Sequence, residues 1–409
     1  MIARVLLVGD ELLGGAASDR NVATIAIALG SRGVPVVGVE VVGDDVPLIA
    51  EAARRLASRC DVLVVTGGLG PTADDLTREG LAAALGVKVV VSEEALRQVI
   101  ARYAERSVST DGPGVRRQAS VPEGTETVEN PVGTAPGFTG RLGACRFWCL
   151  PGVPPEVVEM AGSVAKGLGE LPPAWGWQRW VATAGIGETR VADRLDAGGF
   201  APPEGVRLAY LPSPGGVRLR LAAPRGAPDE VLDGAEREVR RLLGSWALPL
   251  PGLAESLVRS FADRGATIAT AESCTGGLLG ARITDVPGSS SVYLGGIISY
   301  SNRVKVERLG VDPGLLEAYG AVSEPVARAM AEGARAAFGP SLAVADTGIA
   351  GPGGGTPQKP VGTVWIAVAD DSGTEAVSFR FPGNREMVRE RTVHKALELA
   401  YRRGEGSRT

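Results

Sequence analysis

The sequence contains few of the residues that most often carry enzyme chemistry. Its 409 residues include one histidine, His394, and four cysteines. A serine–histidine–aspartate triad would depend on this one histidine, which the pattern places on the surface of a C-terminal helix, so such a triad is not expected. The cysteines are too scattered for a disulfide framework, and histidine and cysteine together are too few for a zinc site. Cys145 and Cys149 are instead predicted to lie in the core.

Lysine is also scarce, because arginine supplies nearly all of the positive charge. The five lysines are Lys88, Lys166, Lys305, Lys359 and Lys395. The formal net charge is −4, with acidic and basic residues mixed along the chain, which argues against nucleic acid as a partner. No apolar run reaches the roughly 18 residues that a membrane-spanning helix needs. Residues 1–4 lead into a strand-like run without the pattern of a signal peptide, so we expect a cytoplasmic protein with no membrane partner.

Length and local pattern together predict three domains. Residues 1–169 and 250–409 alternate strand-like and helix-like runs, whereas residues 170–249 have a different pattern and are bracketed by proline-rich stretches. The middle segment predicts a small α+β module with a strand at 177–184, a helix at 188–197, a hairpin at 206–222 and a helix at 228–243. No residue cluster in it suggests chemistry, and we interpret it as a spacer or interface domain.

The first domain is predicted to be a parallel α/β sheet with helices on both faces. Apolar strands are expected at 5–8, 34–42, 61–65 and 145–150, and helices at 21–29, 47–56 and 156–165. Such sheets bind ligands beyond the carboxyl ends of their strands. Two loops lie at these ends, at residues 9–11 and 66–72, and the second is expected to open a helix at residues 74–77. Residues 105–140 are predicted to be rich in loops.

Acidic residues beside these two loops predict a divalent-metal site. Asp10 and Glu11 follow the first strand, and Asp74 and Asp75 follow the glycine-rich run at 67–70. Carboxylates next to a glycine loop that cradles phosphate are natural positions for a cation such as Mg²⁺. The alternative is that these acids are ordinary first-turn carboxylates of helices, which suits Asp74 best.

The C-terminal domain is organised around residues 271–277. A β-prone run ends just before Ser273, and a helix-like run begins at Leu278. The hydroxyl of Ser273 is therefore expected at a strand–helix junction, where unpaired backbone N–H groups favour an anion or a developing oxyanion. The alternative is that Ser273 only caps the helix. A second glycine-rich loop, at 347–355, follows another apolar strand, and two such loops predict a phosphate cradle.

A nucleophilic Ser273 needs a base, and Lys305 is the best candidate. It lies five residues beyond Tyr300, in a helix that Asn302 is expected to cap. Lysine, unlike arginine, can act as a base when burial lowers its pKa from about 10.4 toward about 7–8. The alternative is an ordinary solvated lysine on a helix. Cys274 is a rival nucleophile, but without a histidine partner it is expected to be buried and inert.

These motifs resemble the CinA (competence/damage-inducible) family over almost the whole chain. In the first domain the matching stretches are residues 9–14, 19–21, 66–77, 130–138 and 150–154, which are also similar to the molybdopterin-binding MoaB/MogA fold. In the last domain they are residues 271–277, 300–302 with Lys305, 320–323, 347–352 and 359–364. The resemblance implies a MoaB/MogA-like parallel-sheet domain, a small α+β KH-like middle domain and a C-terminal α/β deamidase domain.

The resemblance implies two activities. The C-terminal domain is expected to hydrolyse the carboxamide of nicotinamide mononucleotide without a cofactor, with Ser273 as nucleophile, Lys305 as base and Tyr300 as an assisting hydroxyl. The N-terminal domain is expected to hydrolyse ADP-ribose to AMP and ribose 5-phosphate with a divalent metal, such as Mg²⁺, held by Asp75 and Asp10. Full-length members of the family are expected to form homodimers.

Both substrates are expected to be held by the loops at the strand ends. The residues expected to bind substrate are Thr275, Gly276, Gly277, Thr347, Gly348, Gly351 and Lys359 in the C-terminal domain, and Glu11, Asn21, Gly67, Gly68, Gly70 and Asp74 in the N-terminal domain. Backbone N–H groups near Thr275 and Gly276 are expected to hold the oxyanion.

Two other functions remain open. One is a nucleotide-binding scaffold in DNA uptake with a catalytically silent N-terminal site. Ala73 departs from the family pattern, in which many relatives carry a polar residue before the paired aspartates, and this departure weakens the expected N-terminal activity. The other is nucleic-acid binding by the KH-like module, for which the sequence offers no basic GxxG loop.

Overall fold

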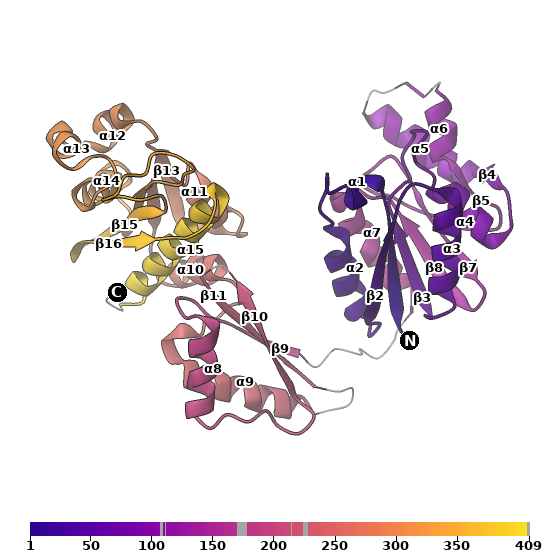
Figure 1. The fold of residues 1–409 in the computed structure, drawn as a ribbon, viewed down its shortest axis with the longest axis horizontal. Coiled ribbons are helices and arrows are strands. Elements are labelled where there is room, and N and C mark those ends of the chain that lie inside the picture. The colour runs from indigo at the N-terminus through magenta and orange to yellow at the C-terminus, as the bar shows by residue number, and fades with distance from the viewer. Residues whose placement is uncertain (107–108, 111, 170–177, 214, 224–227, 407–409) are drawn as a thin grey trace. The chain divides into compact units, whose positions relative to one another are not determined.

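The computed structural model describes residues 1–106, 109–110, 112–169, 178–213, 215–223 and 228–406. The chain divides into two compact units, Met1–Trp177 with Ala223–Ala227 and Gln178–Ala222 with Pro228–Thr409 (Figure 1). The first unit holds the N-terminal domain, and the second combines the middle module with the C-terminal domain. Within the described ranges, no helix has the length and apolar character needed to cross a bilayer.

A six-stranded sheet forms the centre of the first unit, in the order β2-β1-β3-β8-β7-β6. Its strands are β1 (Ala3–Val8), β2 (Val36–Val42), β3 (Val62–Thr66), β6 (Glu126–Val128), β7 (Gly137–Leu142) and β8 (Cys145–Leu150), and a separate ribbon pairs β4 (Val89–Val91) with β5 (Ser120–Pro122). The parallel arrangement predicted from the alternating pattern is confirmed for β1, β2, β3 and β8. At the other edge, β7 is antiparallel to β8 and β6 is antiparallel to β7.

Helices cover both faces of this sheet, because alternate strand residues point to opposite faces (Figure 1). The helices are α1 (Asp10–Leu13), α2 (Asn21–Gly30), α3 (Val46–Ala57), α4 (Thr77–Leu85), α5 (Glu93–Glu105), α6 (Pro113–Gln118) and α7 (Pro154–Gly167). Leu6 of β1 belongs to one core cluster with Ile49 of α3 and Leu81 of α4. Its neighbour Leu7 belongs to the other cluster, with Ile25 of α2.

One prediction for this unit is incomplete and another is wrong. Residues 105–140 contain α6, β5, β6 and part of β7 rather than loops alone, because strands of three residues are too short to show a periodic pattern. Helix α4 begins at Thr77 rather than at Asp74, since Asp74 and Asp75 belong to the turn before it.

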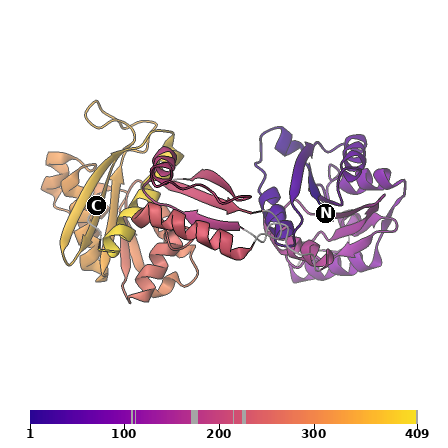
Figure 2. The same ribbon diagram turned by 90° about the horizontal axis from the view of Figure 1, so that it is seen from below.

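The middle module is a small α+β fold, as predicted. Its antiparallel sheet has the order β10-β11-β9. Its elements are β9 (Gln178–Ala182), α8 (Glu188–Ala197), β10 (Arg207–Ser213), β11 (Gly216–Ala222), α9 (Asp229–Leu243) and the short 3-10 helix η1 (Gly244–Trp246). The buried stripe of α9, which includes Leu232 and Val239, is directed at this sheet, and α8 and α9 lie on one of its faces (Figures 1 and 2).

The C-terminal domain is built on a five-stranded sheet in the order β13-β12-β14-β15-β16. Its strands are β12 (Ile268–Glu272), β13 (Tyr293–Ile298), β14 (Leu342–Gly348), β15 (Thr363–Asp370) and β16 (Gly373–Arg380). Its helices are α10 (Leu253–Asp263), α11 (Leu278–Thr284), the 3-10 helix η2 (Ser289–Ser291), α12 (Asn302–Leu309), α13 (Pro313–Tyr319), α14 (Glu324–Phe338) and α15 (Arg385–Gly404). Strands β13, β12 and β14 are parallel, so their carboxyl ends meet at one edge, whereas β15 and β16 are antiparallel.

The two faces of this sheet have separate cores. Val344 packs with residues of α10, α11 and α15, and its neighbour Ala343 packs with Met330 of α14.

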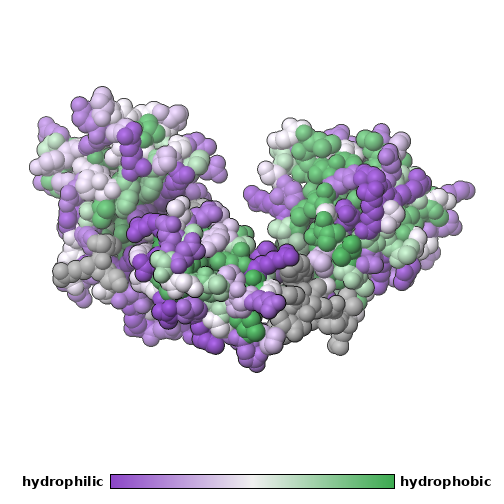
Figure 3. All heavy atoms as spheres, turned by 60° about the horizontal axis from the view of Figure 1, so that its bottom comes forward, coloured by the Kyte–Doolittle hydropathy of each residue, from purple (hydrophilic) through white to green (hydrophobic). Residues whose placement is uncertain are grey.

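Apolar residues also reach the protein surface. Figure 3 shows hydrophobic surface on the N-terminal unit. In this unit the edge strand β2 exposes Val37 and Val39.

Candidate active sites

Ser273 lies just beyond the carboxyl end of strand β12, as predicted. The strand ends at Glu272, and a short turn leads from Ser273 into α11. Gly276 and Gly277 in this turn have φ angles of +62° and +95°. This left-handed conformation is strained for other residues but not for glycine. The turn therefore holds the buried Ser273 at the edge of the sheet where β13, β12 and β14 all end.

Lys305 contacts Ser273 from helix α12. Its Nζ lies 3.0 Å from Ser273 Oγ and donates to the carbonyl oxygen of Ser299 over 2.5 Å. The side chain is only 1% exposed, so it is not a solvated helix lysine. The cap differs from the predicted one, because the side chain of Ser301 caps α12 and Asn302 is its first residue.

The surroundings of Lys305 shift its ionisation toward the neutral amine. Burial lowers the pKa of Lys305, while the nearby Asp346 and Cys274 act in the opposite direction and raise it. A neutral amine has two N–H groups and one lone pair. One N–H can donate to Ser299, and the lone pair can then accept the proton of Ser273. This arrangement suits a base.

Asp346, at the end of β14, is a buried carboxyl group behind Ser273 that the predicted site lacks. It accepts from the backbone N–H groups of Ser273 and Thr275 over 3.4 and 3.2 Å, and from the thiol of Cys274 over 3.1 Å. These bonds fix the turn that carries the nucleophile. An acidic residue at the end of an otherwise apolar strand is the sequence signal that could have identified it.

Glu272 is a second buried carboxyl group in this turn. It accepts from the backbone N–H groups of Gly277, Leu279 and Gly280 over 2.8 to 3.0 Å. These contacts leave fewer backbone N–H groups for the expected oxyanion site, because those of Thr275 and Gly277 already donate to carboxyl oxygens. Of the two predicted donors, Thr275 and Gly276, only Gly276 has an N–H without an acceptor in the described part of the chain.

Two arginines of α15 approach the same loops and are absent from the predicted site. Arg389 donates to the carbonyl oxygen of Thr275 over 2.6 Å. Arg385 donates to the carbonyl oxygen of Gly351 and to the hydroxyl of Tyr300, both over 2.9 Å. The two arginines are four residues apart and so lie on one helix face. Such a pair directly after a helix cap is the signal that sequence reasoning did not use.

Tyr300 is not joined to the reactive pair. Its side chain is 62% exposed and its hydroxyl accepts from Arg385. Among the described residues, no hydrogen bond connects Tyr300 with Ser273 or Lys305.

The other predicted substrate residues of this domain lie in the two loops. Thr347 donates its hydroxyl to the carbonyl oxygen of Ala321 over 2.8 Å, and Lys359 Nζ donates to that of Tyr319 over 2.6 Å. Gly348 lies against the first loop, since a Cβ at this position would be 3.1 Å from the sulfur of Cys274. The structure thus brings the two loops together, with Thr347 and Lys359 already paired within the protein.

The rival groups have other roles. Cys274 is buried, as expected, and this burial raises the pKa of its thiol well above the usual range. The prediction that His394 is a surface residue is wrong. It is half-buried against the middle module, where a Cβ on Gly215 would lie 3.1 Å from its own Cβ, and burial lowers its pKa.

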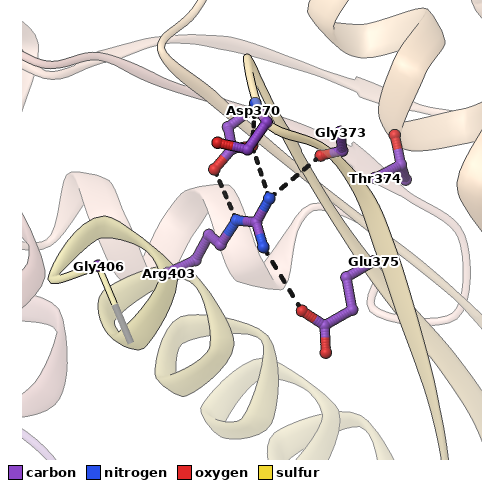
Figure 4. Close-up of a pocket in the computed structure, with 7 residues that line it drawn as sticks. Asp370, Gly373, Thr374, Glu375, Arg403 and Gly406 are labelled. Carbon is purple, nitrogen blue, oxygen red and sulfur yellow. Dashed lines mark hydrogen bonds and ion pairs between the residues drawn. The ribbon is translucent and has the colours of Figure 1, made fainter. Parts of the chain in front are cut away.

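A cleft of about 320 Å³ around Arg403 lies at the other end of the sheet (Figure 4). Arg403 donates to both oxygens of Asp370 over 2.6 and 2.7 Å and forms an ion pair with Glu375 at 3.6 Å. Asp370 ends β15 beside the start of β14, whereas Ser273 lies near the end of β14. The guanidinium of Arg403 is already engaged by both carboxylates, so we assign this cleft no chemistry.

In the N-terminal unit, a cleft of about 460 Å³ opens beyond the carboxyl ends of β1 and β3. It is lined by Glu11, Asn21, Thr66, Gly67 and Gly152, among others. Asn21 donates its amide to Gly152 and Thr66, while its Oδ1 is buried and has no partner in the described ranges. Asn21 therefore offers an acceptor to a ligand, for example a ribose hydroxyl or an adenine amino group.

The loop at 66–72 is held from both sides. Asp75 accepts from the N–H of Gly70 over 2.7 Å and from that of Thr72 over 2.8 Å, so both of its oxygens are engaged. The buried Arg78, absent from the predicted site, donates to the carbonyl oxygen of Leu69 over 2.6 Å. Asp75 thus positions the loop in this structure.

Asp10, Glu11, Asp44 and Asp74 lie near one another but do not form a set of metal ligands in the described part of the chain. Asp10 and Asp44 exchange hydrogen bonds between their backbone N–H groups and carboxylates. The pKa of Asp44 is raised by burial and by the charges of Asp10, Glu11 and Asp74. Within the described ranges, no three His, Cys, Asp or Glu side chains are placed to hold a metal ion. These residues therefore do not fit a preformed protein-only metal site, and an Mg²⁺ ion would have to be bound largely by substrate phosphates and water.

Family models match nearly the whole chain. Residues 4–169 match a probable molybdopterin binding domain, residues 178–247 the damage-inducible protein CinA KH domain and residues 251–403 the CinA C-terminal domain. A CinA-like protein from Citrifermentans bemidjiense is 43% identical over 406 residues, covering 97% of this chain and 96% of the relative. One from Chlorobium limicola is 40% identical over 428 residues, covering 98% and 97%.

Solved structures of CinA proteins match part of this chain. The competence/damage-inducible protein CihA from Agrobacterium tumefaciens is 42% identical, with a TM-score of 0.35, and covers 37% of this chain and 94% of its own. The CinA protein from Thermoplasma acidophilum is 35% identical, with a TM-score of 0.38, and covers 41% of this chain and 99% of its own.

Proposed function

The chain belongs to the CinA family, and we propose that its C-terminal domain is a cytoplasmic nicotinamide-mononucleotide amidohydrolase with Ser273 as nucleophile and Lys305 as base. One observation carries this proposal. The buried amine of Lys305 lies 3.0 Å from Ser273 Oγ, at the carboxyl end of a parallel strand. A serine hydroxyl in contact with a lysine whose pKa is lowered by burial is the pair that a serine–lysine hydrolase requires.

The reaction follows from this pair. Neutral Lys305 takes the Ser273 proton as Oγ attacks the carboxamide carbon, and we assign the oxyanion to the Gly276 N–H, which has no acceptor in the described part of the chain. The Lys305 ammonium then returns the proton to the leaving nitrogen, so that ammonia departs and an ester on Ser273 remains. The same amine deprotonates a water molecule, which hydrolyses the ester to nicotinate mononucleotide and restores Ser273.

Arg385 and Arg389 support a phosphorylated substrate. They bring two positive charges to the place where the glycine loops around Gly276 and Gly351 meet. Guanidinium groups bind phosphate oxygens strongly, and glycine loops let phosphate approach the backbone closely. We therefore assign the mononucleotide phosphate to these arginines and loops, with Thr347 and Lys359 as supporting residues.

The test is ammonia release from nicotinamide mononucleotide by the full-length protein. Ser273→Ala is expected to abolish it without changing thermal unfolding, and Ser290→Ala, at an exposed serine of η2, is the matched control. Ammonia release by Ser273→Ala at the rate of the control would end the proposal.

For the N-terminal domain we propose metal-dependent hydrolysis of ADP-ribose to AMP and ribose 5-phosphate. The support is the cleft at the ends of β1 and β3, where Asn21 offers an unpaired acceptor and exposed Asp10 and Glu11 lie close by. Asp10 is the acid we assign to the metal side, and Asp75 holds the loop. AMP formation with and without added Mg²⁺ is the measurement, and turnover equal in both conditions would contradict metal dependence.

A second candidate for this domain is nucleotide binding without turnover. The observation in its favour is that no three-ligand metal cluster exists among the described residues. ADP-ribose that binds, as measured by calorimetry, but yields no AMP with Mg²⁺ would support it.

We also propose a homodimer. The exposed valines of edge strand β2 are a surface that a partner could cover. Sedimentation equilibrium tests this, and a monomer at micromolar concentration would contradict it.

A further inference from the structure

Behind Ser273, the Thr275 hydroxyl contacts two carboxyl groups, those of Glu272 and Asp346. If both carboxyl groups were ionised, there would be fewer protons than hydrogen-bond contacts. The Thr275 hydroxyl oxygen lies 2.5 Å from Asp346 Oδ2 and 2.7 Å from Glu272 Oε2. A hydroxyl carries one proton and can donate to only one of these oxygens. The other contact would then join two oxygens with no proton between them. All three side chains are buried, so water cannot screen that repulsion. One further proton must belong to this group.

The partners of each oxygen show where that proton lies. Glu272 receives three backbone N–H groups from Gly277, Leu279 and Gly280, which stabilise a negative charge. Asp346 receives its N–H and S–H donors on Oδ1 only, and its Oδ2 contacts Thr275 alone. The proton therefore belongs on Asp346 Oδ2.

We propose that Asp346 is held as a neutral carboxylic acid, which donates to Thr275 Oγ1, while the Thr275 hydroxyl donates to ionised Glu272. The chain Asp346–Thr275–Glu272 places the negative charge at the start of α11 and leaves a neutral group behind Ser273. Burial raises the pKa of Asp346, and the nearby charge of Glu272 acts in the same direction. The charged or titratable groups around it are Glu272 at the end of β12, Cys274 in the turn that follows, and Lys305 from α12.

This state has a consequence for the base, which rests on the proposed deamidase function. An ionised Asp346 would favour the ammonium form of Lys305, whereas a neutral Asp346 leaves burial as the dominant effect on the amine. Asp346 is thus a positioning residue, since it acts on the reaction through the backbone of Ser273 and through Lys305.

Infrared spectroscopy tests the protonation state without any substrate, because a protonated carboxyl group has a C=O band separate from those of carboxylates. We expect this band at pH 8 in the wild-type protein and in Ser273→Ala. It should shift when aspartate is labelled with ¹³C and disappear in Asp346→Asn. The isotope shift needs no variant, so it stands even if Asp346→Asn does not fold. No aspartyl band at pH 8 would overturn the proposal. The band in a protein that does not release ammonia would support it and would refute only the proposed function.

The pH profile of deamidation provides the second readout. Asp346→Asn keeps the shape and the neutrality of the side chain, so the acid limb of the kcat/KM profile should not move, whatever the effect on the height of the profile. A limb displaced to lower pH by about one unit would show that Asp346 carried a charge in the wild-type protein, and would overturn the proposal. Thr275→Val interrupts the hydrogen bonds from Asp346 through Thr275 to Glu272, whereas Thr275→Ser keeps the hydroxyl. The valine variant should therefore lower kcat/KM at least tenfold more than the serine variant. Equal effects would contradict this hydrogen-bond arrangement.

Discussion

Replacement of Lys305 by methionine should remove the base while keeping a linear side chain of similar length in the same buried position. General-base catalysis contributes about 10²–10⁴-fold in rate, so kcat/KM for ammonia release should fall by about that factor. Lys305→Arg should fall equally, because a guanidinium keeps the positive charge but does not give up its proton. The lysine control is Lys88→Met, on the exposed surface of the N-terminal unit.

The same substitution predicts a change in stability with a definite sign. Burial lowers the pKa of Lys305, so the unfolded chain binds this proton more tightly than the folded one. As pH falls below about 10.4, the wild-type protein therefore loses stability through this group until the folded amine is also protonated. Lys305→Met removes this dependence, while the unpaired carbonyl of Ser299 costs about 1–3 kcal/mol at every pH. Its stability relative to wild type should thus improve as pH falls.

Two assays check this account of Lys305. Urea unfolding between pH 7 and pH 10 measures the relative stability, and initial rates of ammonia release over the same range measure kcat/KM. Wild-type kcat/KM should fall on the acid side as the folded amine becomes protonated, and this limb should be lost with the amine. Full activity in Lys305→Met, or in Lys305→Arg, would refute the assignment of Lys305 as base.

Three further predictions concern other groups. Arg389→Ala should raise KM for nicotinamide mononucleotide about tenfold or more and leave the nucleoside without phosphate unaffected; an equal loss for both substrates would contradict a phosphate role. Asp75→Ala should release the 66–72 loop and lower AMP formation from ADP-ribose while sparing ammonia release, and equal loss of both activities would refute independent sites. Cys274→Ala should keep deamidation within about threefold and cost about 1 kcal/mol in unfolding free energy, whereas complete inactivation would identify the thiol as the nucleophile.

The sequence predicts most of the fold because its elements carry strong local signals. The apolar strand that ends just before Ser273 and the helix-like run that begins at Leu278 are examples. The short strands β5 and β6 have no such signal and are missed. The expected cap at Asn302 is displaced by one residue to Ser301, which carries a capping side chain of similar strength.

The candidate site likewise has one part that the sequence predicts and another part that it does not. The contact between Ser273 and Lys305 follows from strand ends that meet at one sheet edge, which the alternating pattern indicates. Asp346 and the arginines of α15 come from distant segments, and only tertiary packing brings them to Ser273 and Thr275. Asp75 shows the reverse case, since its position in sequence suggests a metal ligand but its oxygens are engaged by the neighbouring loop.

The most direct test of the central claim is acylation of the full-length protein by an activated ester, with the modified residue located by peptide mass spectrometry. If Lys305 activates the nucleophile, the acyl group should map to Ser273, and its rate of attachment should fall by about 10²-fold or more in Lys305→Met. Acylation at another residue, or at Ser273 with an unchanged rate in Lys305→Met, would contradict the account.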